Sequence, residues 1–503
     1  MPLARAWSVA LIGIEGRPVE IEADIGAGLP GTKLVGLPDA GLREAKDRVR
    51  AAVRNSGQRW PDSNVTLGLS PADLPKDGSG YDLGIAAAVL AASGAVPAPK
   101  LLDTALLGEL ALDGRVRPVR GVLPALLAAR KAGYRRAVVA LESLAEGSLV
   151  GGIDVVGAER LGELISWLCD EGSLASAEPD RGPALPEHAD LADVVGQPEA
   201  RWALEVAAAG GHNLLMTGPP GVGKTMLARR LPGLLPELGD DEALEVTAVH
   251  SVDGSLQPDS PLVRMPPFVA PHHSISVAAL IGGGTGIAAP GAISKAHRGV
   301  LFLDEAAEYG GERLDALRTV LEEGEVRIAR SRGSVRYPAR FQLVLATNTC
   351  PCAPPRETEC SCSPAARRRY LAKLSGPLLD RVDLRVRMRP VTAMTMAGGE
   401  AAEPTGRVRE RVVAARERAA KRWSDHGWQT NAEVPGPVLR REFALPAEVT
   451  RLLDRGLNRG AITARGADRC LRIAWSLADL DEAEEPVADH VAAALEFRDR
   501  RAV

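Results

Sequence analysis

One segment of the chain has the residue types and spacing that bind phosphate groups. Residues 218–225 read Gly-Pro-Pro-Gly-Val-Gly-Lys-Thr, between an apolar run at 212–217 and a helix-like run at 226–230. The glycines let backbone N–H groups curl around phosphates, the Lys224 ammonium can reach the β and γ oxygens, and the Thr225 hydroxyl can hold Mg²⁺ at the start of a helix. The predicted nucleotide-binding residues are Gly218, Pro219, Pro220, Gly221, Val222, Gly223, Lys224 and Thr225. This context favours a nucleoside triphosphate with magnesium over a chance glycine-rich turn.

Two carboxylates and one amide follow apolar runs further along the chain. Asp304 and Glu305 come directly after 300–303, and Asn348 ends the run 341–347. If both runs are strands, Asp304 can bind Mg²⁺ through water and Glu305 can polarise the attacking water. Asn348 is then placed to orient water against the γ-phosphate. These residues predict hydrolysis of the nucleotide, and the alternative is a buried strand that merely ends in acidic residues.

Four of the six cysteines form a C-x-C-x₇-C-x-C cluster, which consists of Cys350, Cys352, Cys360 and Cys362. Four thiolates suit tetrahedral Zn²⁺ in a reducing compartment. The spacing differs from the common C-x₂-C, so unmetallated thiols in a proline-rich loop stay open as the alternative. The neighbouring His272 and His273 are not expected to bind metal, since adjacent strand residues point to opposite faces. A packing or substrate-facing role is the better prediction for them.

The composition limits the possible partners and location. The 503 residues are 45% hydrophobic, which is normal for globular domains, and they contain no run of membrane length and no signal-peptide cleavage pattern. A formal net charge of −4 provides no global positive field, so any polyanion site needs a local arrangement of arginines. With aromatics at only 3%, binding of single strands through many stacked bases is disfavoured. We therefore expect a multidomain protein of the cytoplasm with no membrane partner.

The pattern of the chain divides it into three regions and a linker. Residues 1–172 mix strand-like and alanine-rich helical runs, as an α+β domain would. Residues 173–190 are rich in Pro, Gly, Ser and acidic residues and are predicted to be a linker. Residues 191–390 alternate strands and helices around the phosphate loop, and residues 391–503 are mainly helical. The strand-like runs are 19–23, 65–69 and 136–140, and the helical runs are 83–92 and 123–132. The predicted fold class is multidomain α/β.

These elements, in this order, resemble an AAA+ ATPase with Asn348 at the sensor 1 position. The segment LSGPLLDRVDL at 374–384 matches the arginine-finger segment of the Mg-chelatase I subunits, and ITARGADR at 462–469 resembles their sensor 2 helix. By this resemblance Arg381 is a trans-acting finger and Arg465 a cis-acting sensor. A finger completes the site of a neighbouring subunit, so the resemblance implies a ring, as a hexamer. Ordinary surface arginines are the alternative.

Further segments narrow the resemblance to the ComM (YifB) subfamily of the Mg-chelatase-like proteins, over essentially the whole chain. They include PPFVAPHHSIS at 266–276 and LEEGEVRIAR at 321–330. In that group a β-hairpin precedes the sensor 1 strand, and here the runs 325–330 and 335–340 flank a plausible turn. The arginines expected at its tip or on one face are Arg327, Arg330, Arg332 and Arg336. Such a cluster could grip the phosphates of single-stranded or branched DNA in the pore, and a solvated hairpin with intersubunit ion pairs is the alternative.

The N-terminal region resembles the Lon-protease-like domain (ribosomal S5 domain 2-like fold), on the residues LPKDG at 74–78 and GRVRP at 114–118. Alignment on these residues puts Asp82 at the nucleophile position and Leu123 at the position of the catalytic lysine. Without a Ser/Lys pair there is no activated hydroxyl, so a binding or assembly domain is expected. Ser79 and Lys76 are the remaining candidates, but they are too close in sequence to repeat the Lon arrangement.

Three functions compete. The first is an ATP-driven DNA motor, resembling a ComM-like helicase that promotes branch migration in homologous recombination or natural transformation. The second is a metal-chelatase-type or chaperone-like protein remodeller, and the third is an ATP-dependent protease. The Lon-like domain and the cysteine cluster favour the first over the second, and the missing Ser/Lys pair disfavours the third. The C-terminal region resembles a helical lid, and its basic run at 407–422 fits a solvated face better than a DNA contact.

Overall fold

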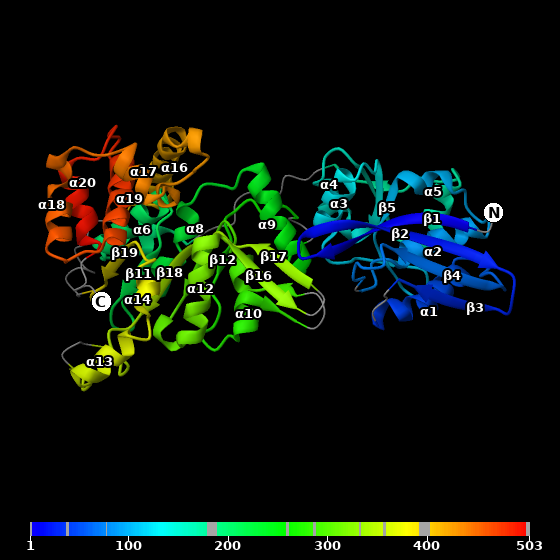
Figure 1. Ribbon diagram of the computed structural model, residues 1–503, viewed down its shortest axis with the longest axis horizontal. Helices are drawn as coiled ribbons and strands as arrows, with labels where there is room; N and C mark the ends of the chain where they lie inside the picture. The colour runs from blue at the N-terminus through cyan, green and yellow to red at the C-terminus, as the bar shows by residue number, and fades with distance from the viewer. Residues whose placement is uncertain are drawn as a thin grey trace.

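The computed structural model describes residues 3–36, 40–76, 78–178, 189–257, 261–284, 288–330, 333–355, 359–391 and 403–498, without the side chains of 40–43, 330 and 333. It contains a mixed sheet in the N-terminal part, a parallel sheet in the central part and a group of helices in the C-terminal part (Figure 1). The mixed α/β class predicted from the sequence is therefore confirmed. None of the helices in the described part of the chain is both long and apolar enough to cross a membrane.

The N-terminal sheet has eight strands in the order β10-β9-β8-β5-β1-β2-β4-β3. Its strands are β1 (Leu3–Ile12), β2 (Glu15–Gly26), β3 (Gly31–Val35), β4 (Asn64–Ser70), β5 (Thr104–Leu106), β8 (Arg136–Ala140), β9 (Asp154–Ala158) and β10 (Ala175–Ser176). Strands β1 and β2 form a long antiparallel hairpin, whereas β1, β5, β8 and β9 run parallel. The strand-like runs predicted from the sequence lie in β2, β4 and β8. Strand β10 falls inside the segment predicted as a linker. Its residues form a strand because they pair with β9 at the edge of the sheet.

Helices cover both faces of this sheet. The cores that they form place α1 (Ala40–Asn55), α2 (Asp82–Ala92) and α5 (Leu161–Leu168) on one face and α3 (Val122–Lys131) and α4 (Leu144–Ser148) on the other. The short strands β6 (Glu109–Leu110) and β7 (Val116–Arg117) pair with each other. The two helical runs predicted from the sequence correspond to α2 and α3.

The central sheet has five parallel strands in the order β12-β15-β18-β11-β19. Their bounds are β12 (Phe268–Val269), β15 (Val300–Leu303), β18 (Gln342–Thr347), β11 (Leu214–Thr217) and β19 (Leu384–Arg387). Every residue of β11, β15 and β18 is buried, since helices cover both faces of a parallel sheet. All five strands end at the same edge, which is therefore where the segments following β11, β15 and β18 meet.

The helices of the central part are α6 (Pro198–Gly210), α7 (Lys224–Ala228), α8 (Leu231–Leu234), α9 (Asp240–Asp253), α10 (Val277–Ile281), α11 (Ala292–Lys295), α12 (Gly311–Glu323), α13 (Pro364–Leu371) and α14 (Gly376–Leu379). Short strands β13 (Gly282–Gly283) and β14 (Ala289–Pro290) pair with each other. The predicted hairpin is present as β16 (Glu325–Arg330) and β17 (Gly333–Pro338), with its second strand beginning earlier than the sequence predicts. Helix α6 packs on one sheet face, and α12 with the hairpin packs on the other.

The C-terminal helices are α16 (Thr405–Arg422), α17 (Gly436–Arg441), α18 (Ala447–Asn458), α19 (Ala464–Leu480) and α20 (Ala488–Glu496). They pack with α6 in one continuous core around the fully buried Trp423. Trp423 donates a 2.9 Å hydrogen bond to Asn431, so its polar atom is satisfied inside this core. The C-terminal helices are thereby fixed to the central sheet through α6.

The N-terminal part contacts the central part at two places. At the first, Gly121 donates a backbone hydrogen bond of 3.1 Å to Ser251 of α9, and the half-buried Glu146 accepts from the Ser251 hydroxyl and from Leu123 N. At the second, the β1–β2 turn lies against β17, where Gly13 has a φ of 67° and a Cβ placed on it would lie 2.7 Å from Val335 Cγ1. The hairpin β16–β17 is thus held between the central sheet and the N-terminal part.

Candidate nucleotide site

The phosphate-binding loop follows β11 and leads into α7. Gly223, directly before α7, has a φ of 93°, which a side chain would strain. Lys224 is 8% exposed, and its ammonium donates hydrogen bonds of 2.8 Å to the carbonyls of Gly218 and Pro219. Burial lowers the pKa of Lys224. The loop therefore curls around its own lysine, as a phosphate cradle requires.

A magnesium-type pair of oxygens lies beside the loop. The Thr225 hydroxyl donates a 2.6 Å hydrogen bond to Asp304 Oδ2, which follows β15. A hydroxyl and a carboxylate oxygen are ligands that Mg²⁺ prefers, and the ion usually keeps waters and substrate phosphates as its other ligands. Thr225 and Asp304 therefore fit the roles predicted from the sequence.

Asn348 joins the same cluster from β18. Lys224 Nζ donates a 3.1 Å hydrogen bond to Asn348 Oδ1. Three segments spread over 124 residues of sequence thus converge, because β15, β18 and β11 are consecutive in the sheet and share a carboxyl edge. Lys224, Thr225, Asp304, Glu305 and Asn348 lie together at this edge, as the sequence predicts.

Glu305 stands at the exposed side of the cluster in an unusual backbone conformation. Its φ of 51° and ψ of 43° are left-handed, which costs a non-glycine residue about 1–2 kcal/mol. Its carboxylate Oε2 lies 3.3 Å from His273 Nδ1. A strained backbone held next to a specific partner is typical of a positioned catalytic group.

His273 reaches Glu305 from the segment that follows β12. That segment is anchored by the Tyr309 hydroxyl, which donates to the carbonyl of Pro271, and Tyr309 in turn accepts a 2.7 Å hydrogen bond from Arg313 at its own carbonyl. The sequence predicts only a packing or substrate-facing role for the histidine pair. The sequence does not reveal that β12 pairs with β15, and it is this pairing that brings the ends of the two strands together.

Arg381 lies at the opposite edge of the sheet. It precedes β19, where Asn213, at the start of β11, donates a 2.9 Å hydrogen bond from Nδ2 to the carbonyl of Arg381. The side chain of Arg381 is 12% exposed and is held by the carboxylate of Glu322 and the carbonyl of Pro377. It lines a cleft of about 830 Å³ at the amino ends of the strands. One chain therefore does not bring Arg381 to its own Lys224.

Arg465 lies on the Arg381 side of the sheet. It is exposed in the first turn of α19, and one turn later Arg469 forms an ion pair with the buried Asp383. The backbone of Gly466 lies near Arg498, which donates to the carbonyl of Val382. The start of α19 is thereby fixed at the amino edge. Within the described ranges, no hydrogen bond or ion pair joins Arg465 to the phosphate loop of the same chain.

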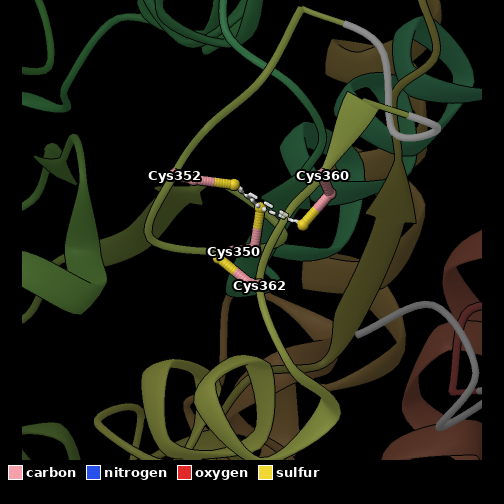
Figure 2. Close-up of side chains that lie close together, drawn as sticks. All are labelled: Cys350, Cys352, Cys360 and Cys362. Carbon is pink, nitrogen blue, oxygen red and sulfur yellow. Dashed lines mark hydrogen bonds between the residues drawn. The ribbon is translucent and has the colours of Figure 1, made fainter.

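The four clustered cysteines converge after β18 (Figure 2). Their sulfur atoms all lie within 4.8 Å of one another, and the Sγ atoms of Cys350, Cys352 and Cys360 are 3.4–3.5 Å apart. A tetrahedral site with Zn–S bonds of about 2.3 Å has edges near 3.8 Å, so the arrangement fits zinc. A backbone N–H from Cys362 and nearby thiols lower the pKa of Cys360 to about 6, whereas burial raises that of Cys350 to about 12.

The hairpin carries two of the four predicted DNA-binding arginines on its exposed side. Arg327 and Arg336 lie directly opposite each other in the β16–β17 register. Arg327 pairs with Glu325, and the guanidinium of Arg336 lies 3.7 Å from the carboxylate of Glu15 at the start of β2. The side chain of Arg330 and the whole of Arg332 fall outside the described residues. The hairpin is thus an ion-paired element in the single chain, with part of its charge facing the N-terminal part.

The N-terminal candidates do not form a catalytic pair. Asp82 is buried against Arg48 with a hydrogen bond of 2.9 Å, and burial raises its pKa to about 6. Leu123 is fully buried in α3. The Ser79 hydroxyl contacts Glu109, and the Lys76 ammonium contacts the carbonyl of Pro71.

The parallel sheet with a phosphate loop, a magnesium-type pair and an arginine at the far edge defines a P-loop ATPase. Three family models match the chain: magnesium chelatase, subunit ChlI, at residues 190–396; subunit ChlI of Mg-chelatase at 21–143; and magnesium chelatase, subunit ChlI C-terminal, at 402–498.

Similar proteins extend over the whole chain. It is 60% identical to an uncharacterised protein of Mycobacterium tuberculosis, with 99% of each chain covered. It is 40% identical to the uncharacterised protein YifB of Escherichia coli, over 99% of this chain and 97% of the relative. It is 41% identical to the competence protein ComM of Haemophilus influenzae, over 99% and 98%. The chain belongs to the ComM (YifB) subfamily of the Mg-chelatase-like AAA+ proteins, a family whose members are ATPases that use ATP and Mg²⁺.

Proposed function

We propose that this chain is an ATP-dependent ring motor that acts on DNA, as a ComM-like helicase that promotes branch migration in homologous recombination or natural transformation. The observation that carries the proposal is the separation of its catalytic groups. Lys224, Asp304 and Asn348 cluster at the carboxyl edge of the central sheet, and Arg381 lies at the amino edge. A complete ATP site therefore needs the carboxyl edge of one subunit and the amino edge of the next.

This geometry supports a ring. The cleft beside Arg381 receives the nucleotide edge of the neighbouring subunit, and closed repetition of one such contact gives a ring, which we take to be a hexamer. Arg465 lies on the same side as Arg381 and acts on the same neighbouring nucleotide. Glu322 holds Arg381 until that nucleotide competes for the guanidinium.

DNA is the proposed substrate because of the hairpin and the relatives. The hairpin β16–β17 presents Arg327 and Arg336 side by side on an exposed face, where they can contact phosphates without reading sequence. One full-length relative is named a competence protein. The predicted domains 1–172, 191–390 and 391–503 then serve as an inactive Lon-like assembly domain, the ATPase core and a helical lid.

The cysteine cluster is proposed to hold one structural Zn²⁺ in a cytoplasmic, reducing environment. Four sulfur ligands with mutual distances below 4.8 Å form a closed site of the kind that zinc uses for structure. Elemental analysis of the purified protein is expected to give about one zinc per chain, in proportion to the four thiolates of this site. A zinc content far below this value would mean that the four cysteines are free thiols.

A synthetic four-way DNA junction tests the motor. The purified protein with ATP and Mg²⁺ is expected to convert the labelled junction into two duplex arms, and the Lys224→Ala variant is expected to fail because it cannot hold the phosphates. If the wild type hydrolyses ATP but converts neither junctions nor forked duplexes, the chain would instead be a protein-remodelling motor. ATP-dependent cleavage of casein that Ser79→Ala abolishes would instead establish a protease.

A further inference from the structure

Helix α13 is a basic projection between the cysteine cluster and α14. It extends from the central part on the side away from the N-terminal sheet and well separated from the hairpin β16–β17 (Figure 1). Its eight residues, Pro364–Leu371, include three consecutive arginines and no acidic residue. All three arginines are exposed. In a chain with a net charge of −4, this is a strong local positive charge.

Two of these arginines differ from those of the hairpin in their partners. Arg367 hydrogen bonds to the thiol of Cys360. The side chains of Arg368 and Arg369 have no hydrogen bond or ion pair with any residue in the described ranges, whereas Arg327 and Arg336 each have a carboxylate neighbour. Arg368 and Arg369 both lie in the last turn of α13, where a cation is favoured by the helix dipole, but no carboxylate in the described ranges neutralises either guanidinium.

The helix is nevertheless held firmly. It starts two residues after Cys362, and the Ser363 hydroxyl caps it by accepting a 3.2 Å hydrogen bond from Ala366 N. Tyr370 is 4% exposed, and Lys373 just beyond the helix forms a 3.1 Å ion pair with Glu308. The two unpartnered guanidiniums are thus presented to solvent by a fixed element, so little side-chain and backbone ordering remains to be done on binding.

The helix is also linked in sequence to the nucleotide site. Asn348, which accepts from Lys224, is followed by only one residue before Cys350, the most buried of the four cysteines. A metal held by the cluster would therefore connect Asn348 on one side with α13 on the other.

We propose that α13 is a second DNA contact of the motor, in which Arg368 and Arg369 bind the phosphodiester backbone outside the pore hairpin and the cysteine cluster transmits that contact to Asn348. This inference rests on the proposed DNA motor and adds a site to it. Two unpaired guanidiniums are complementary to two phosphates, and Arg is the side chain that binds phosphate through paired N–H groups.

The test is the salt dependence of binding to a fluorescein-labelled oligo(dT) strand, measured by anisotropy on the full-length protein. The double variant Arg368→Ala/Arg369→Ala is expected to reduce the slope of log K against log salt by about 1.4, because about 0.7 is lost for each phosphate contact of a single strand. The stimulation of ATP hydrolysis by DNA should be lost, and hydrolysis without DNA should be unchanged. Arg368→Lys/Arg369→Lys should keep the slope, since the charge remains.

A matched control removes the same charge elsewhere. Arg50 and Arg54 are exposed on α1 of the N-terminal part, so Arg50→Ala/Arg54→Ala should bind DNA like the wild type. If the α13 variant binds DNA as tightly as the wild type, with the same slope of log K against log salt, the second contact is overturned and the proposed motor stands. Loss of ring assembly in that variant, measured by light scattering, would assign the helix to a protein contact instead. Failure of the wild type to bind any DNA overturns both proposals.

Discussion

His273 Nδ1 lies 3.3 Å from Glu305 Oε2, so a histidine from the segment that follows β12 contacts the carboxylate predicted to polarise the attacking water. The contact joins two strand ends, and Glu305 keeps a left-handed φ of 51° there. His273→Ala is expected to lower kcat for ATP about tenfold, because the carboxylate is no longer oriented, and to leave KM nearly unchanged. Steady-state hydrolysis across ATP concentrations gives both parameters.

His272 provides the matched control for this prediction. Its ring packs at a tilt against that of His273, with centroids 4.1 Å apart, but its Nδ1 bonds to Ser274 at 2.7 Å and not to Glu305. His272→Ala should therefore hydrolyse ATP like the wild type. Equal losses in the two variants would mean that the segment is needed as a whole, and that the His273 contact positions nothing.

The placement of Lys224 and Arg381 on opposite edges predicts complementation between inactive subunits. Lys224→Ala and Arg381→Ala should each hydrolyse ATP at least about a thousandfold more slowly, since a finger contributes about 10³–10⁵ in rate. In a 1:1 mixture, about a quarter of the interfaces should combine an intact Lys224 with an intact Arg381 if subunits assemble at random. The mixture should then recover about a quarter of the wild-type rate. A mixture as inactive as its components would argue against a shared site.

The elements of the ATP site could be predicted because each lies within a short run of sequence. Lys224, Asp304 and Asn348 follow apolar runs that are typical of buried strands, and in the structure those strands are consecutive in the sheet. The contact of His273 with Glu305 could not be predicted in this way. It depends on β12 pairing with β15, and β12 has only two residues, which is too short for a periodic pattern.

Contacts between segments far apart in the sequence could not be predicted either. The cis role predicted for Arg465 comes from resemblance alone, whereas its position is set by Arg469 pairing with Asp383 at the amino edge. The approach of Glu15 to Arg336 joins two parts of the chain whose docking no local pattern reveals. Hydrophobic periodicity predicts which residues are buried, but not which buried faces meet.

The close approach of the β1–β2 turn to the hairpin predicts a selective effect of a small side chain at Gly13. A Cβ there would lie 2.7 Å from Val335 Cγ1 and 2.9 Å from the carbonyl of Arg336. Gly13→Ala is expected to cost about 2–3 kcal/mol of stability, from the left-handed φ and the forced shift of β17 together. Hydrogen exchange of the β16–β17 amides should become faster.

Gly57 separates these two causes. It has a φ of 79°, but a Cβ there would meet nothing within 4 Å. Gly57→Ala should cost only about 1 kcal/mol and leave the exchange of β16–β17 unchanged. If Gly13→Ala behaves like Gly57→Ala in both measurements, the turn does not press on the hairpin.

The buried His212 predicts a loss of stability in mild acid. Burial lowers its pKa to about 4, and its Nε2 is 2.7 Å from the hydroxyl of Ser476 on α19. Between pH 6.5 and about 4 the unfolded chain takes up a proton that the folded chain refuses. This contribution to stability is therefore complete above pH 6.5 and decreases as the pH falls through that window. From pH 7.5 to 5 the loss amounts to about 2 kcal/mol.

Urea unfolding at these two pH values, followed by tryptophan fluorescence, measures this effect near the site. Trp423 and the neighbouring Trp475 lie in the same core as α19, so their emission reports on the region around His212. His212→Gln keeps a polar partner for Ser476 but cannot titrate, and it should lose about 2 kcal/mol less than the wild type between pH 7.5 and 5. Equal losses in the two proteins would show that His212 takes up its proton as readily in the folded chain as in the unfolded one.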